Sequence, residues 1–273
     1  MRLFVFGLGY AARTVAGAAG APLLATTRDG RDGTIRFDDE AAVCAGLAAS
    51  THVLSSVPPD DAGDPVLRHY EAALAGRWLG YLSSTGVYGD TGGAWVDEAA
   101  AADRGRRPLR NVADAAWLAR GARVFRLPGI YGPGRSPLDR VASGEAHRTG
   151  VAGQVFSRVH VTDLASGVVA GFDAPAGAYN LADELPAPQD EVVAYAAQLL
   201  GLAPPPIVPV EQLSPAARGF HAENRRVANG KAKRVLNWRP RYPDYRAGLR
   251  ALSATTSPTA ASPAPVAASN VQR

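Results

Sequence analysis

Three small residues near the start of the sequence have the spacing of a phosphate-binding turn. Gly7, Gly9 and Ala12 form the pattern G-x-G-x-x-A. A glycine at the first position permits a tight turn, and one at the second has no side chain to keep a pyrophosphate from the backbone. Alanine at the third position lets a helix pack closely, and the helix N-terminus offers free N–H groups to an anion. The spacing therefore predicts that a dinucleotide binds here, with Leu8 and Tyr10 on the same turn.

The segments on either side supply the elements that this turn requires. Residues 3–6 are an unbroken apolar run suited to a strand buried on both faces, and residues 11–19 are predicted to form a helix. Strand, glycine turn and helix in this order are the context in which the short motif has meaning. The same small residues could join a strand to a helix without binding anything, but the context favours the cofactor.

The end of the second predicted strand indicates which dinucleotide binds. Residues 22–28 form an apolar run that ends in Thr27 and Arg28, with no acidic residue before Asp29. An acidic residue at this place binds the ribose 2′-hydroxyl of NAD, whereas a hydroxyl and a guanidinium suit the 2′-phosphate of NADP. We therefore predict NADP in preference to NAD; the alternative for Arg28 is a solvated loop position.

Two further strand ends carry residues that we expect near the cofactor. Asp38 is predicted to bond the adenine or, alternatively, to cap the helix expected at 39–49. Ser55 and Ser56 end the strand expected at 51–57, and we place them near the phosphates or the ribose.

Alternating strands and helices indicate an α/β fold: a Rossmann-type doubly wound parallel sheet with a small C-terminal substrate lobe. Ligands of such sheets bind at the carboxyl ends of the strands, where the glycine turn, Ser55 and Ser84 all fall. Later in the chain we expect a helix capped by Thr162 or Asp163 and another over residues 225–238. The remaining expected elements are helices at 64–76, 108–121 and 189–201, and strands at 34–38, 77–83, 122–127 and 178–181.

Residues 1–250 are expected to form one extended domain. The predicted cofactor-binding part covers about residues 1–134 and 156–184, and the small lobe about 135–155 and 185–250. Residues 253–273 are rich in Ala, Pro, Ser and Thr without apolar periodicity, which predicts a disordered tail.

Composition excludes several classes of function. Hydrophobic content of 47% and charged content of 20% are typical of a soluble globular protein, and no apolar run would span a bilayer. The net charge of +4 is dispersed, which argues against a nucleic-acid partner. Cys44 is the only cysteine, so neither an internal disulfide nor a cysteine metal pair can form. We expect a cytoplasmic protein with no bound metal, no membrane partner and a small-molecule substrate.

Four blocks of the sequence resemble the extended short-chain dehydrogenase/reductase superfamily, in its NAD-dependent epimerase/dehydratase-like group. The blocks occur in family order, and the resemblance covers about residues 1–250. They lie at residues 7–12, 83–89, 126–134 and 159–164. The chain is most similar to an atypical YeeZ-like subgroup, whose C-terminal part also resembles residues 237–246. The resemblance implies that Pro128 belongs to the cofactor site.

The resemblance also implies a catalytic serine and a Tyr-x-x-x-Lys pair, of which only the serine is present. Ser84 falls on the serine position, whereas Arg106 and Arg110 stand where the tyrosine and the lysine are expected. The only lysines are Lys231 and Lys233, and neither follows a tyrosine at the required spacing. Arginine stays protonated, so Arg106 cannot act as the general acid/base. Arg110 could still supply positive charge to the ribose or to an oxyanion.

A substitute acid/base would need a hydroxyl or an imidazole near Ser84. The candidates are Tyr88, Tyr131 and His160, and each could instead be a packed residue of its motif. We place Tyr88 with Ser84 and Arg110 in the predicted catalytic site. Arg106, Arg107 and Arg110 could together bind an anionic substrate, or they could belong to a solvated loop.

We therefore predict an NADP(H)-dependent oxidoreductase that acts at a carbonyl or carbinol carbon of a small molecule. The alternative is a catalytically inactive dinucleotide-binding protein that senses redox state or regulates a partner, as the missing pair would allow. Because this fold often pairs through helices that flank the sheet, a homodimer is a further expectation.

Overall fold

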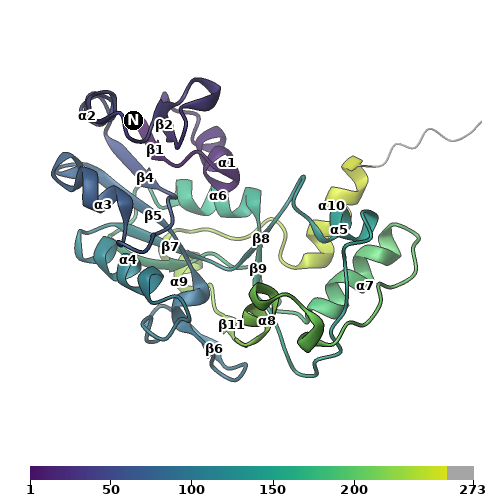
Figure 1. Cartoon of the computed structure of the whole chain (residues 1–273). Coiled ribbons are helices and arrows are strands. Elements are labelled where there is room, and N and C mark those ends of the chain that lie inside the picture. Colours follow the sequence, from purple (N-terminus) through teal and green to yellow (C-terminus); the bar gives the residue numbers. More distant parts are fainter. Residues whose placement is uncertain (257–273) are drawn as a thin grey trace, which may run out of the picture.

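The computed structural model describes residues 1–256. Its centre is a seven-stranded sheet in the order β10-β7-β5-β4-β1-β2-β3, and every pairing in it is parallel. This confirms the predicted doubly wound α/β fold (Figure 1). Its strands are β1 (Leu3–Phe6), β2 (Leu23–Thr27), β3 (Ile35–Arg36), β4 (His52–Ser55), β5 (Trp78–Ser84), β7 (Arg123–Leu127) and β10 (Gly177–Asn180).

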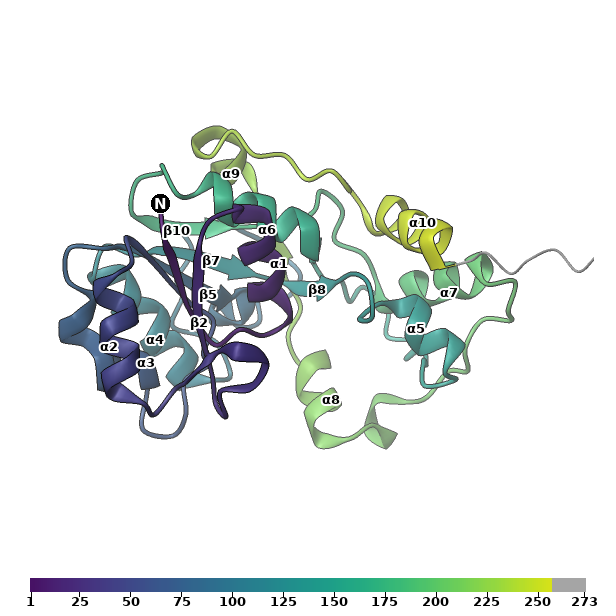
Figure 2. The same ribbon diagram turned by 90° about the horizontal axis from the view of Figure 1, so that it is seen from above.

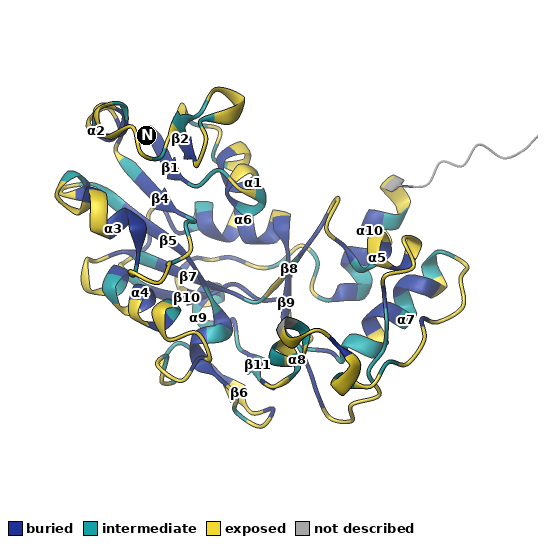
Figure 3. Cartoon of the chain, in the orientation of Figure 1, coloured by how far each residue is buried: buried dark blue, intermediate teal, exposed yellow. Residues whose placement is uncertain are grey.

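Helices cover both faces of the sheet, as Figure 2 shows from above. One face packs against α1 (Tyr10–Ala19), α6 (Val161–Ala170) and α9 (Gly230–Val235). The other packs against α2 (Glu40–Ala48), α3 (Pro65–Tyr70) and α4 (Pro108–Ala119). The central strands are therefore largely buried on both sides (Figure 3), which explains their apolar sequences, whereas the edge strand β3 is not buried.

A smaller lobe lies beyond the carboxyl ends of the strands (Figure 1). Its own apolar core joins α5 (Pro137–Ala142), α7 (Gln189–Leu199) and α10 (Tyr245–Thr256). The pair β8 (Gly129–Tyr131) and β9 (Arg158–His160) connects the two parts, and α8 (Pro215–His221) lies between them. A second short pair joins β6 (Trp95–Val96) to β11 (Arg226–Val227). Single 3₁₀ turns lie at η1 (Arg31–Gly33), η2 (Glu71–Leu74), η3 (Thr85–Tyr88) and η4 (Val210–Gln212).

Two suggested helix caps are wrong: Asp38 for α2, one of the two roles left open for it, and Thr162 or Asp163 for α6. The side chain of Asp39, and not that of Asp38, caps α2 by accepting the Ala42 N–H. His160 caps α6, because its ring nitrogen accepts the Thr162 N–H. His160 has the extended backbone that is typical of an N-cap residue.

The C-terminal part also differs from the prediction. Residues 225–238 are not one helix, because residues 226–227 pair with β6 before α9 begins. The predicted tail at 253–273 starts within α10, which continues to Thr256; the rest of that prediction lies outside the described residues. Within residues 1–256, no helix combines the length and the apolar character needed to cross a membrane.

Candidate functional site

The turn after β1 has the backbone geometry of an anion cradle. Gly7 has φ +78°, and a Cβ there would lie 3.0 Å from Val57 Cγ2 and 3.1 Å from Ser56 Oγ. Glycine is therefore required by conformation and by space. Gly9 precedes α1 without any side-chain cap, and a Cβ there would meet no protein atom within 4 Å. The start of α1 therefore has no side-chain cap and borders open space that suits a phosphate.

The other residues of the motif fix this turn in place. The Gly7 N–H donates to Thr26 Oγ1 at 3.2 Å, and the Leu8 N–H donates to the Thr26 carbonyl at 2.9 Å. Ala12 is buried against the sheet, as the motif predicts. The Tyr10 hydroxyl donates to the Pro133 carbonyl at 3.1 Å, which ties the turn to the segment that follows β8.

Four arginines surround the end of β2, where the adenosine would lie. Arg28 is exposed, and its side chain makes no hydrogen bond or ion pair with the described residues. The other three are each paired with an aspartate: Arg13 with Asp32, Arg31 with Asp29 and Arg36 with Asp38. Arg28 is therefore the guanidinium here that remains available to a ligand.

The neighbouring predicted residues have mixed roles. The buried Thr27 hydroxyl donates to Asp29 Oδ1 at 3.2 Å and shares a 2.7 Å hydrogen bond with Thr34. Arg36 donates two hydrogen bonds to Asp38, at 3.0 and 2.7 Å, and these bonds lower the pKa of that carboxyl. Asp38 is exposed at the edge of the sheet, so its contact with an adenine stays a prediction.

Ser55 is the last residue of β4, and Ser56 follows it beside the glycine turn. Ser56 donates a short hydrogen bond to the Gly7 carbonyl and so helps to fix the conformation of the turn. Ser55 is fully buried between Phe6 and Tyr81 in the sheet, and its hydroxyl has no partner among the described residues. Its position does not support the predicted contact with phosphates or ribose.

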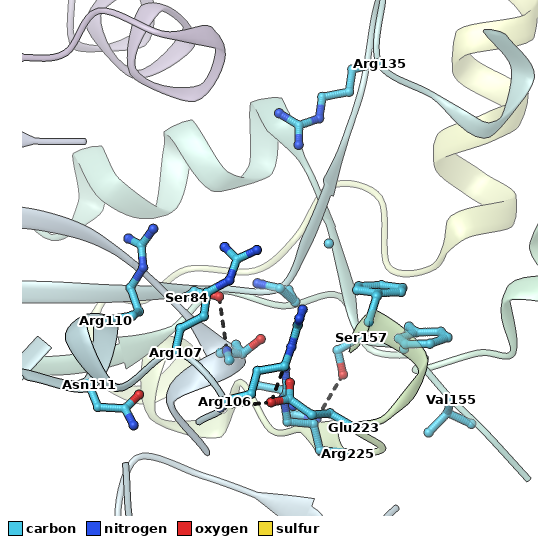
Figure 4. Close-up of a pocket in the computed structure, with 17 residues that line it drawn as sticks. Ser84, Arg106, Arg107, Arg110, Asn111, Arg135, Val155, Ser157, Glu223 and Arg225 are labelled. Atoms are coloured by element: carbon cyan, nitrogen blue, oxygen red, sulfur yellow. Dashed lines mark hydrogen bonds and ion pairs between the residues drawn. The ribbon is translucent and has the colours of Figure 1, made fainter. Parts of the chain in front are cut away.

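A cavity of about 350 Å³ opens at the carboxyl ends of β5 and β7. Ser84, Arg110 and Pro128, all predicted site residues, line it together with Arg106 and Arg107 (Figure 4). Arg135 reaches toward the cavity from the other side, and its guanidinium lies 5.8 Å from the centre of the Tyr10 ring. The cavity and the glycine turn are thus neighbouring parts of one site.

Ser84 and Arg110, the predicted catalytic serine and positive charge, line the same cavity. Ser84 ends β5, and its hydroxyl accepts the Gly86 N–H at 3.1 Å. Arg110 lies in the first turn of α4 and donates to the Tyr81 hydroxyl at 3.2 Å. Burial raises the pKa of Tyr81 to about 12, although Arg110 opposes the shift. Tyr81 therefore stays protonated and cannot serve as a base near neutral pH.

Two of the other arginines of the cavity share one carboxylate. Arg106 lies 3.6 Å from Glu223, and Arg225 donates to the same carboxylate at 2.8 Å. Arg107 makes no side-chain hydrogen bond or ion pair within residues 1–256. Glu223 and Arg225 lie far from Ser84 in the sequence and in no recognisable motif, so sequence reasoning missed them.

Tyr88 does not lie in this cavity, which corrects its predicted catalytic role. Its side chain is 1% exposed, and its hydroxyl donates to Asn180 Oδ1 at 2.8 Å and accepts from Arg126 at 3.1 Å. Burial raises its pKa, although Arg126 opposes the shift. Tyr88 is therefore a buried structural residue behind the site.

Tyr131 and His160, the two other candidate acid/bases, are also absent from the cavity lining. Burial raises the pKa of Tyr131, and the charge of Asp183 adds to the shift. Tyr131 lines a second cavity of about 820 Å³ toward the small lobe. The His160 side chain caps α6. Burial, together with the charge of Arg241, lowers its pKa to about 4.

A buried ion pair supports the site from behind. Arg126 donates to Asp114 at 2.7 and 3.2 Å, and both side chains are almost fully buried. Ser83 also donates to Asp114, at 2.6 Å. Burial opposes the charge of Arg126, but its bonds to Asp114 raise its pKa. The pair links α4 with β5 and β7, and so fixes Arg110 relative to Ser84.

No protein-family model matches the chain. A conserved protein of unknown function from Silicibacter pomeroyi is 40% identical with a TM-score of 0.85, over 93% of this chain and 98% of that one. The human epimerase family protein SDR39U1, solved with NADPH, is 16% identical with a TM-score of 0.73, over 93% and 99% of the two chains. A Thermus thermophilus UDP-glucose 4-epimerase, solved with NAD, is 20% identical with a TM-score of 0.70, over 93% and 98%.

The fold defines the class: it is the fold of the solved NAD-dependent epimerase/dehydratase-like proteins, the group that the four sequence blocks resemble. Within that class it shares a family with the Silicibacter pomeroyi protein. One curated relative, the 3-diazoavenalumate denitrifying reductase of a Streptomyces species, is 30% identical over 138 residues. That match spans 46% of this chain and 45% of the reductase, just under half of each.

Proposed function

We propose that this protein is an NADP(H)-dependent oxidoreductase that acts at a carbonyl or carbinol carbon of an anionic small molecule. One observation carries the proposal: Ser84 and Arg110 line a cavity that is joined, through Arg135 and Tyr10, to the glycine turn. Hydride transfer to an oxygen-bearing carbon requires three features in one site: a hydroxyl, a fixed positive charge and a dinucleotide-binding turn.

The residues present fit a nicotinamide dinucleotide. Gly7 and Gly9 leave the start of α1 open to a pyrophosphate, and a larger side chain at Gly9 would fill that space. Both NADPH and NAD occur in solved proteins of this fold. We favour NADP because Arg28 lacks an acidic partner within the described residues, whereas its neighbours are paired.

Each cavity residue has a role in the proposed reaction. Bound NADP(H) supplies or accepts hydride at its nicotinamide ring. Ser84 hydrogen-bonds the reacting oxygen, while Arg110 stabilises negative charge that develops there or holds the nicotinamide ribose. The described lining holds no tyrosine or histidine, so we propose that the proton for the oxygen comes from solvent. The curated relative is named a reductase, which supports redox chemistry.

The competing proposal is a dinucleotide-binding protein without turnover, which the missing Tyr-x-x-x-Lys pair supports. The test is to titrate the protein with NADPH by fluorescence, and then to follow NADPH oxidation with a panel of carbonyl compounds. Gly9→Asp should abolish NADPH binding, whereas Ser84→Ala should keep binding and lose turnover. Binding without turnover across the panel would favour the competing proposal, and full turnover by Ser84→Ala would refute the role of Ser84.

Several expectations stay predictions. These are membership of the YeeZ-like subgroup, a homodimer formed through helices that flank the sheet, a cytoplasmic location, and a substrate-binding role for the small lobe. The replacement of the Tyr-x-x-x-Lys pair by Arg106 and Arg110 supports the first of them.

A further inference from the structure

We propose that the substrate of this site is a small aromatic acid, with one planar ring that carries a carboxylate. The proposal rests on the oxidoreductase function above and adds the class of molecule that the cavity recognises. It follows from two features of the lining that the proposed redox chemistry does not use: an excess of arginine and an exposed aromatic stack.

The cavity has far more positive charge than its single acid can neutralise. Arginines line it from three separate stretches of chain: Arg106, Arg107, Arg110, Arg135 and Arg225. Among the described lining residues the only acid is Glu223, and it is already shared by Arg106 and Arg225. Arg107 and Arg135 are without an acidic partner in the described chain. Guanidinium groups bind carboxylates through paired, charge-assisted hydrogen bonds, so the unpaired arginines favour an anionic substrate.

An aromatic stack forms another part of the same wall. The rings of Phe156 and Phe220 lie 4.4 Å apart at an angle of 9°. The edge of the His221 ring approaches both, at 5.6 and 5.8 Å between ring centres. Phe220 lines the cavity and is 45% exposed, so part of its ring is not covered by other side chains. Its uncovered ring surface suits a planar ring, because offset stacking adds to the gain from burial.

The arginines and the aromatic stack lie close together in the cavity wall. A substrate that contacts both must therefore be small. A Cβ on Gly219 would lie 2.8 Å from Arg106 Nη1, so the backbone of α8 directly before Phe220 rests on that guanidinium. Phe156 and Phe220 line both cavities and form part of the wall between them. A cavity of about 350 Å³ that must also admit a nicotinamide leaves room for one ring and its carboxylate.

The test measures binding separately from turnover. Calorimetric titrations of the full chain saturated with NADPH would use cinnamate, cinnamamide, 3-cyclohexylpropanoate and uridine monophosphate as probes. Cinnamate is expected to bind about tenfold or more tightly than the amide, which lacks the charge, and than the cyclohexyl acid, which lacks the planar ring. Equal affinities for cinnamate and either analogue would overturn the proposal, as would tighter binding of uridine monophosphate than of cinnamate.

Two variants connect the preference to the residues. Arg107→Gln should weaken cinnamate but not cinnamamide, whereas Arg104→Gln, outside the cavity lining, should change neither. Phe220→Leu should weaken cinnamate but not the cyclohexyl acid. If both variants kept the cinnamate selectivity of the wild-type protein, that result would contradict the assignment. A protein that binds NADPH but no acid would refute this inference alone, whereas failure to bind NADPH would refute the proposed function itself.

Discussion

The substitution Gly9→Ala, which adds one methyl group, is expected to weaken cofactor binding without destabilising the fold. Gly9 has φ −85° and ψ −171°, a conformation that alanine adopts without strain. The added Cβ would meet no protein atom within 4 Å. In the proposed complex the pyrophosphate takes that space, so Gly9→Ala should impair binding and leave the fold unchanged.

The magnitudes follow from the position of Gly9 before α1. Alanine is a poorer N-cap than glycine by about 0.5–1 kcal/mol, whereas loss of glycine's freedom in the unfolded chain stabilises by about 0.4–1 kcal/mol. The free energy of unfolding should therefore change by about 0.5 kcal/mol or less, a melting shift of ~2 °C or less. Each charge-assisted hydrogen bond lost to a phosphate costs about 1.5–3 kcal/mol, so Kd for NADPH should rise by about tenfold to more than a hundredfold.

Gly7→Ala is the matched comparison two residues earlier. Its φ of +78° costs an alanine about 1–2 kcal/mol, and the new methyl group would lie 3.0 Å from Val57 Cγ2. The melting temperature of this variant should fall by about 2–8 °C. Fluorescence titration with NADPH and thermal melts without it measure the two effects. Wild-type NADPH affinity in Gly9→Ala would refute the proposed cradle, and so would a melting temperature as low as that of Gly7→Ala.

Three further predictions concern charge. Arg28→Glu should lower NADPH affinity about tenfold or more and spare NADH affinity; an unchanged ratio of the two dissociation constants would contradict the NADP assignment. Asp114→Ala leaves Arg126 buried without its carboxylate and should lower the free energy of unfolding by about 3–5 kcal/mol in denaturant titrations; a loss below ~1 kcal/mol would show the pair to be dispensable. Burial raises the pKa of Asp183 to about 8, although Arg158 opposes the shift, so the folded state holds this proton more tightly than the unfolded chain. Its contribution to stability is therefore lost as pH rises from about 4 to 8, by at most ~1.4 kcal/mol per pH unit. Asp183→Asn should remove this slope, and identical pH profiles for the two proteins would refute it.

The sheet, the glycine turn and the places of Ser84 and Arg110 could be predicted from the sequence. Each depends on residues close together in the chain: apolar runs that form buried strands, and Gly7 and Gly9 at a fixed spacing. The alternation of strands and helices indicates a parallel sheet and restricts the possible topologies, whereas the strand order itself is seen only in the structure. The absence of a Tyr-x-x-x-Lys pair is likewise a property of the sequence alone.

Only the tertiary structure decided which other side chains join the site. Tyr88 is four residues from Ser84, yet Arg126 and Asn180, which are distant in sequence, hold its hydroxyl away from the cavity. Arg225 reaches the site by donating to the Gly89 carbonyl across 136 residues, and α8 carries Phe220 to the same wall. Such contacts depend on how the small lobe packs against the sheet, and no local pattern records them. The sequence by itself therefore determined that a dinucleotide fold is present, whereas long-range packing determined that its cavity is lined by arginines and an aromatic stack.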